Sequence, residues 1–152
     1  MRALVQRVSQ GGVFIRAEKH AANIGKGMVL LLGIKNGDTE DDVEFVADKC
    51  TNLRIFDDND GKMNLSLKDI NGEVLIISQF TLYGDARKGN RPSFTEAALP
   101  SVANKLYQKF ILRMRKNLGA EKVKTGIFAA MMDVKIINDG PVTIMVESKD
   151  HN

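Results

Sequence analysis

Two uninterrupted apolar stretches constrain the fold more than any other feature of the sequence. The first, MVLLLGI, covers residues 28–34, and the second runs from Val74 to Ile77. A strand with one face in water alternates apolar and polar residues, whereas a strand covered on both faces is apolar throughout. We therefore expect a strand covered on both faces at 28–34 and a second buried strand at 74–77.

Helical patterns lie between and after these strands. Thr39 can cap a helix with an acidic first turn, and residues 93–96 have the spacing of a capping box, which predicts a short helix there. Pro100 begins a longer helix that is expected to end near Gly119. One face of this longer helix is apolar and carries Leu106, Phe110, Met114 and Leu118.

Turn-forming residues predict further strands around this core. Gln10-Gly11-Gly12 is expected to connect the strands of a hairpin at 2–9 and 13–17, and Asn138-Asp139-Gly140 is expected to connect MDVKII to VTIMVES. LRIF at 53–56 predicts a short strand, and the DDNDGK segment that follows predicts a turn. No repeat or linker interrupts the chain, so we expect residues 1–152 to form one α+β domain.

Composition limits where and with what the protein works. The chain is 43% hydrophobic and 27% charged, with a formal net charge of +3, as in ordinary globular proteins. Its one cysteine, Cys50, suits a reducing compartment, and we find neither a signal peptide nor an apolar run of membrane-spanning length. We therefore expect a cytoplasmic protein with neither a membrane nor DNA as its partner.

Few side chains are suited to catalysis. His151 is next to last, His20 lies in a short polar connection, and Cys50 falls on the apolar side of its helix. The sequence also has neither a metal-ligand cluster nor a nucleotide-binding glycine pattern. If the protein is an enzyme, its catalysis must therefore depend on backbone groups, hydroxyls or the substrate itself.

The polar segment after the second buried strand is a candidate site. In SQFT, residues 78–81, a bend could aim consecutive N–H groups at one point, as in an oxyanion hole, and the hydroxyls of Ser78 and Thr81 could assist. The residues alone favour a simpler interpretation, in which the same segment is a polar turn that satisfies a sheet edge.

A basic stripe on the long helix is a second candidate. Cations there lie roughly opposite the apolar face, where they could contact the phosphates of a nucleic acid or form an ordinary solvated surface. The stripe consists of Lys105, Lys109, Arg113 and Lys116.

Taken together, several segments closely resemble the D-aminoacyl-tRNA deacylases, also called D-tyrosyl-tRNA deacylases. The similarity covers essentially the whole chain and depends most on SQ-x-T and N-x-GPVT, although Met131 lies where many relatives carry an acidic residue. The segments are MRALVQRVS at the start, SQFTLYGD at 78–85, RPSF at 91–94 and NDGPVT at 138–143.

The resemblance implies an editing enzyme that hydrolyses the ester between a D-amino acid and the terminal adenosine of tRNA. Such enzymes are cytoplasmic homodimers without a metal or other cofactor, and they have two β-layers and a helical layer (β/β/α) with mixed sheets. In this family Ser78, Gln79, Phe80 and Thr81 would line the pocket and carry the catalytic step. Substrate-binding roles would fall to Arg7, Phe128 and Asn138, with Phe80 or Phe128 stacking on the terminal adenine.

The resemblance also implies a cis peptide bond between Gly140 and Pro141, and a pair that reaches into the partner subunit's pocket. Its carbonyl groups could accept hydrogen bonds from the substrate ammonium group and leave no room for an L side chain, so that glycine would still be accepted. Water would be oriented by the 2′-hydroxyl group of the tRNA, and Thr81 as a nucleophile is the second choice. An RNA-binding module without activity and a small-molecule esterase using Ser78 or Ser93 are the alternatives.

Overall fold

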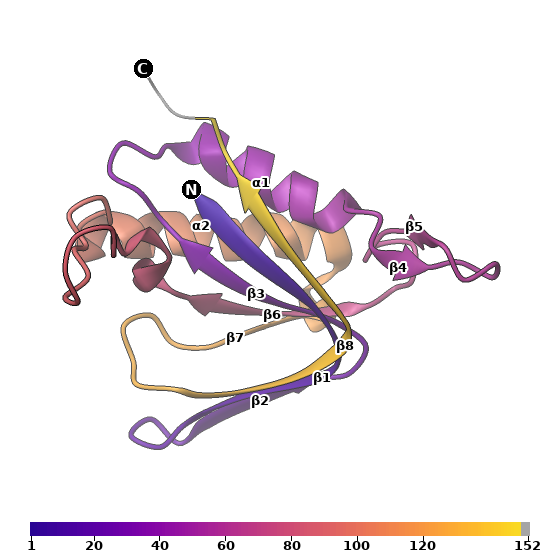
Figure 1. The fold of residues 1–152 in the computed structure, drawn as a ribbon. Coiled ribbons are helices and arrows are strands. Elements are labelled where there is room, and N and C mark those ends of the chain that lie inside the picture. Colours follow the sequence, from indigo (N-terminus) through magenta and orange to yellow (C-terminus); the bar gives the residue numbers. More distant parts are fainter. Residues whose placement is uncertain (150–152) are drawn as a thin grey trace.

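The computed structural model describes residues 1–149, which form a bent, barrel-like mixed sheet of six strands, a separate two-stranded sheet and two helices (Figure 1). Strands β1 (Arg2–Ile15), β2 (His20–Ile24), β3 (Gly27–Gly33), β6 (Glu73–Ser78) and β7 (Val123–Thr125) are ordered β2-β1-β3-β6-β7 in this sheet. Strand β8 (Asp133–Glu147) pairs with β1 along its other side. The pairs β3–β6 and β6–β7 are parallel, and the pairs that involve β1 are antiparallel.

Both faces of β3 and β6 are buried, as the apolar stretches predict. Met28, Leu30 and Leu32 face the core beneath the helices, whereas Val29 faces a second core on the other side of the sheet. Residues of β6 alternate in the same way, with Ile76 in the first core and Ile77 in the second. The second core is closed by β2 and the half of β1 that pairs with it.

Helices α1 (Glu40–Asn52) and α2 (Pro100–Leu118) pack against each other over one face of the sheet (Figure 1). Thr39 is the N-cap residue of α1, as expected. Its backbone N–H group donates a hydrogen bond to the Asp42 carboxylate at 2.7 Å, as in a capping box. The apolar face of α2 is confirmed, since Phe110 and Met114 are fully buried. Each helix connects two parallel strands, so it must cross the sheet between them.

The prediction of a hairpin at Gln10-Gly11-Gly12 is wrong, because β1 continues through these residues without reversing. The chain turns after Ile15 instead, and β2 then pairs with the second half of β1. A Cβ atom at Gly11 would lie 2.8 Å from Val29 Cγ2. The glycines therefore allow a bent strand to pass close over its neighbour and do not form a turn.

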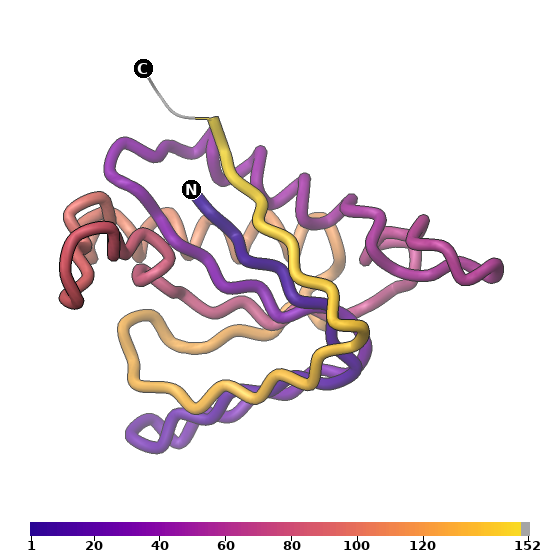
Figure 2. The backbone as a smooth tube through the Cα atoms, viewed as in Figure 1, coloured from indigo at the N-terminus to yellow at the C-terminus, as the bar shows by residue number. Residues whose placement is uncertain are grey.

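The prediction of a hairpin at Asn138-Asp139-Gly140 is also wrong. Both halves of β8 run antiparallel to β1, with Asn138 opposite Val8 and Thr143 opposite Gln6. Four residues of β8 thus face a single residue of β1, which makes a wide bulge where the strand bends without reversing (Figure 2). The cis bond between Gly140 and Pro141 is confirmed and lies within this bulge.

Two local expectations need smaller corrections. Residues 93–96 do not begin a helix, since Ser93 pairs in extended conformation with Asp85 and a turn follows. LRIF contributes only Phe56 to a strand, β4 (Phe56–Asp57), which pairs with β5 (Met63–Leu65). The DDNDGK turn between them is confirmed by the hydrogen bond from Asp58 N to Lys62 O at 2.8 Å.

The α+β fold is confirmed, and its two β-layers are the two halves of one bent sheet. β1 and β8 pass from the layer under the helices into the lower layer with β2 (Figures 1 and 2). Among residues 1–149, we find no helix that is long and apolar enough to cross a membrane.

Candidate active site

A cavity of about 660 Å³ opens at the carboxyl end of β6, where the buried strand becomes polar. Its wall combines this strand end with the segment before α2 and with the loop between β7 and β8. The lining residues include Ser78, Gln79, Phe80, Phe94, Phe128 and Met131. The volume is within the range of small-molecule sites, and the structure therefore brings four of the expected site residues to one cavity.

Large apolar side chains surround the mouth of the cavity and remain exposed. Phe80 is 57% exposed and meets the edge of Phe94 at a centroid distance of 5.2 Å. Met131, which the sequence marks as a departure from many relatives, is 92% exposed on the opposite loop. Ala129 in this loop has a φ of +64°, a left-handed conformation that is uncommon outside glycine.

The SQFT segment forms a tight turn at this mouth. Residues Phe80–Tyr83 make a 3₁₀ turn, η1, whose first internal hydrogen bond runs from Leu82 N to Gln79 O at 3.2 Å. The N–H groups of Phe80 and Thr81 precede that bond, so they have no acceptor within the turn. The Gln79 side-chain amide donates to the Thr81 hydroxyl, which is exposed but does not line the cavity.

Phe128 forms part of the cavity wall from the core side. It is partly buried, and its ring lies 5.9 Å from the ring of Tyr107, measured between centroids. Tyr107 in turn donates to the backbone oxygen of Ile76 at 3.0 Å. This packing fixes the position of Phe128 relative to β6.

Gly140, Pro141 and Asn138 lie away from this cavity. Asn138 is opposite Val8, which is also opposite Gly27 at the first residue of β3. Ser78, by contrast, is opposite Leu32, five residues further along β3, or about 16 Å at strand spacing. The bulge and the cavity are therefore at opposite ends of the central strands of this chain.

Arg7 lies directly beneath the bulge and is only 7% exposed. Its guanidinium group donates to the backbone oxygen of Asp139 at 2.9 Å and to that of Ile55 at 2.8 Å. Looser ion pairs to Asp57 and Asp139, at 3.5 Å, complete its surroundings. Arg7 thus ties the bulge to the segment before β4, and the sequence alone gave no indication of this role.

The basic stripe of α2 is largely engaged by α1. Arg113 donates to the Asp48 carboxylate at 2.9 and 2.7 Å, and Lys109 pairs with Glu40. These hydrogen bonds are the main cause of the lowered pKa of each carboxyl group. Two of the four stripe cations therefore connect the helices, while Lys105 and Lys116 are exposed.

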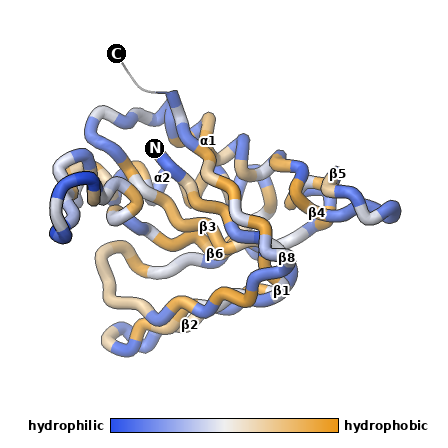
Figure 3. The backbone as a smooth tube through the Cα atoms, in the orientation of Figure 1, coloured by the Kyte–Doolittle hydropathy of each residue, from blue (hydrophilic) through white to orange (hydrophobic). Residues whose placement is uncertain are grey.

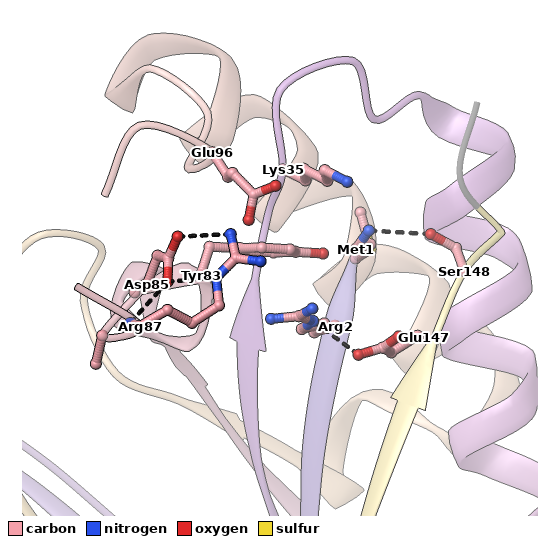
Figure 4. A pocket seen from close by; sticks show the side chains of 11 residues that line it. Met1, Arg2, Lys35, Tyr83, Asp85, Arg87, Glu96, Glu147 and Ser148 are labelled. Carbon is pink, nitrogen blue, oxygen red and sulfur yellow. Dashed lines mark hydrogen bonds and ion pairs between the residues drawn. The ribbon is translucent and has the colours of Figure 1, made fainter. Parts of the chain in front are cut away.

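A second, more polar cavity lies between Tyr83 at the end of η1 and the side chains of Arg2 and Glu147 (Figure 4). There Arg2 donates to the backbone oxygen of Leu82 at 3.0 Å, pairs with Glu147 and lies 4.5 Å over the Tyr83 ring. These contacts attach the first residue of β1 and the last residue of β8 to the turn that carries the candidate site.

The remaining reactive side chains are far from catalytic geometry. Burial raises the pKa of the Cys50 thiol to about 12, so this side chain is an unreactive core residue. His20 makes a 2.9 Å contact to the backbone oxygen of Thr125, and His151 lies outside the described residues. Within the described chain, no group of three or more His, Cys, Asp or Glu residues is arranged to hold a metal ion.

Comparison with known proteins identifies the family. Residues 4–147 match the family model described as D-Tyr-tRNA(Tyr) deacylase. The chain belongs to this deacylase family. D-aminoacyl-tRNA deacylases from Thermotoga petrophila and Fervidobacterium nodosum are 55% and 56% identical to it, over 97% and 98% of both chains.

Solved structures share the fold of this chain. One described as c-Myc DNA Unwinding Element Binding Protein is 41% identical, with a TM-score of 0.92 over 99% of this chain and all of that chain. Another, described as a probable eukaryotic D-amino acid tRNA deacylase, shares the fold with a TM-score of 0.83 at 18% identity, over 97% of this chain and 98% of that chain.

The role of Arg7 can be tested by Arg7→Lys. A lysine retains the charge but loses the fork that reaches both carbonyl groups, so a buried acceptor loses its partner. We expect the free energy of unfolding, measured in urea, to fall by about 1–3 kcal/mol. Arg54→Lys is the matched control, since exposed Arg54 also bonds a backbone oxygen, and it should change stability by less than about 0.5 kcal/mol. Equal effects of the two changes would contradict this role.

Proposed function

We propose that the protein hydrolyses the ester bond of D-aminoacyl-tRNA and releases the free amino acid and the tRNA. The observation that carries this proposal is the cavity at the end of β6, into which a chain of the deacylase family brings Ser78, Gln79 and Phe80. Its largely apolar wall suits an adenosine and an amino-acid side chain. In this proposal the terminal adenine stacks on Phe80 or Phe128, both of which line the cavity.

The proposed catalysis uses the main chain and the substrate. Backbone N–H groups of Phe80 and Thr81 without acceptors in η1 are suited to stabilise the negative charge that develops on the ester oxygen. The 2′-hydroxyl group of the terminal ribose then orients the attacking water. Thr81 is a poor nucleophile, because its hydroxyl group contacts the Gln79 amide, which cannot accept a proton as a general base.

Chiral selection is proposed to require a second copy of the chain. Gly140-Pro141 cannot reach the cavity of its own subunit, since the two are separated by most of the length of β3. The bulge does lie in the middle of β8, whose outer edge has no strand partner among residues 1–149. The same strand carries the exposed apolar side chains of Ile137, Ile144 and Met145. Such an edge is normally covered, and a homodimer that covers it would bring the bulge to the partner's cavity.

In the dimer, the carbonyl groups of the bulge would bind the substrate ammonium group and exclude an L side chain. Arg7 would contribute by holding the Asp139 carbonyl and thereby the bulge, which makes it a positioning residue. Glycine carries no side chain to exclude, so glycyl-tRNA would also be hydrolysed. The two rivals remain an RNA-binding module without activity and an esterase that uses Ser78 or Ser93.

The function is tested by incubating the protein with D-tyrosyl-, L-tyrosyl- and glycyl-tRNA and measuring the released amino acid. We expect rapid release from the D form, release from glycyl-tRNA, and no release from the L form above the spontaneous rate. Binding without release would favour the RNA-binding module. Cleavage of simple esters in the absence of tRNA would favour the esterase.

Thr81→Val separates main-chain catalysis from a threonine nucleophile. Loss of an attacking side chain costs about 10⁴-fold or more in turnover. If the hydroxyl group only bonds to Gln79, we expect D-tyrosyl-tRNA hydrolysis to fall by less than about tenfold. Single-turnover kinetics compare the hydrolysis rates of the wild type and of the folded variant. A variant rate at the spontaneous level would refute main-chain catalysis.

Gly140→Ala tests the chiral role of the bulge. Gly140 has a φ of +131°, and a Cβ atom would approach Val142 N to 3.0 Å, so the bulge would have to move. A shift of about 1 Å in a positioning group can cost about a hundredfold, and we expect a loss of this order in kcat/KM for D-tyrosyl-tRNA. Gly37→Ala is the control, because Gly37 also has a positive φ but is surrounded by open space. A Gly140→Ala enzyme with the control's activity would contradict this role.

A further inference from the structure

Residues 86–91, ARKGNR, form an exposed loop, which we call the basic loop. It connects η1 to the segment of Phe94, and both Phe80 of η1 and Phe94 line the candidate active site. Half of its residues are cations, Arg87, Lys88 and Arg91, and it contains no acid. The segment after η1 is among the most hydrophilic parts of the chain (Figure 3).

The basic loop is fixed next to the cavity. Asp85 and Ser93 flank it and exchange two backbone hydrogen bonds, of 2.7 and 2.9 Å, which close its base. On one side the chain continues from η1, and on the other it continues directly into Phe94 at the cavity mouth. The cations of the loop are therefore only a few residues along the chain from Phe94, which lines the site.

The cations of the loop differ in how they are engaged. Arg87 forms two hydrogen bonds to the Asp85 carboxylate, at 2.9 and 2.7 Å, which lower the pKa of that carboxyl group to about 2 (Figure 4). Lys88 and Arg91, by contrast, have no carboxylate partner among residues 1–149. Two charges on the loop are thus available to an external anion.

The stripe on α2 is less suited to the same task. Lys109 and Arg113 already pair with carboxylates of α1. The remaining stripe cations lie near these carboxylates, since the charges of Lys105 and Lys116 are among the smaller causes of the lowered pKa of Glu40 and of Asp48, respectively. A phosphate that approached the stripe would therefore also meet the acids of α1.

Phe94 lies between the basic loop and the cavity. It is 38% exposed, lines the cavity mouth and presents its ring at 69° to the ring of Phe80. Unpaired nucleotides are commonly bound by aromatic side chains that stack on their bases and by cations that contact their phosphates. Phe94 and the loop supply both kinds of group in adjacent positions.

We propose that the basic loop and Phe94 form the path along which the single-stranded 3′ end of a tRNA enters the cavity. This inference rests on the proposed function, because it assumes that the terminal adenosine occupies the cavity. Lys88 and Arg91 contact phosphates, Phe94 stacks on a base ahead of the terminal adenosine, and the α2 stripe does not contact the tRNA.

The charge component is tested with a variant that combines Lys88→Ala and Arg91→Ala. Its affinity for fluorescently labelled uncharged tRNA is measured by anisotropy at several salt concentrations. Removal of two single-strand phosphate contacts should flatten the slope of log K against log salt concentration by about 1.4. Lys62→Ala with Lys68→Ala removes two exposed lysines near the distant β4–β5 pair and should leave the slope as in the wild type.

The rival surface is tested in parallel with Lys105→Ala and Lys116→Ala. A flatter slope for this pair, or an unaltered slope for the Lys88 and Arg91 variant, would overturn the inference. The binding measurement uses uncharged tRNA and therefore does not depend on hydrolysis. If the wild type binds tRNA through the loop but releases no D-tyrosine, the proposed function fails, whereas the contact between the basic loop and the tRNA stands.

The stacking component is tested with Phe94→Ala. Loss of one base contact should weaken binding of a short single-stranded RNA ending in CCA by about fivefold or more. Phe94→Tyr retains an aromatic ring and should restore the affinity, whereas Phe94→Leu retains apolar bulk without a ring and should not restore it. Phe45→Ala removes a phenyl ring of similar exposure on α1 and serves as the control. Equal losses for Phe94→Ala and Phe45→Ala would contradict stacking.

Discussion

The burial of both faces of β3 and β6 is the constraint on which the rest of this structure depends. Helices alone cover one face, and the sheet itself must cover the other, which it does because β1 and β8 bend into a second layer. That bend requires glycine where β1 passes over Val29, and it requires the wide bulge in β8. The bulge that we propose for chiral selection is thus also a consequence of how the core is closed.

The sequence predicted the elements that depend on local pattern. The buried strands, the capped start of α1 and the apolar face of α2 follow from residue spacing within a single element. The two hairpin predictions are wrong because glycine and asparagine favour any departure from a regular strand, whether a reversal or a bulge. Only pairing with β1, more than a hundred residues away, decides that β8 continues in the same direction.

The candidate site was predictable to a similar extent. SQFT marks the change from apolar to polar at the end of β6, and this signal correctly indicates the cavity. The position of Gly140-Pro141 at the opposite end depends on strand register, and the pairing of the α2 stripe with α1 depends on the packing of two helices. Arg7 was assigned to the substrate through the resemblance, whereas its contacts in the structure are with backbone oxygens.

The pairing of β1 with β8 also has a consequence for how the chain folds. Arg2 is opposite Glu147, so the first strand to be synthesised is completed by the last. Contacts with such large sequence separation slow folding, because much of the chain must be ordered before they form. Until β8 is made, one edge of β1 has no strand partner next to a growing apolar core, and unpaired strand edges of this kind favour aggregation of a nascent chain.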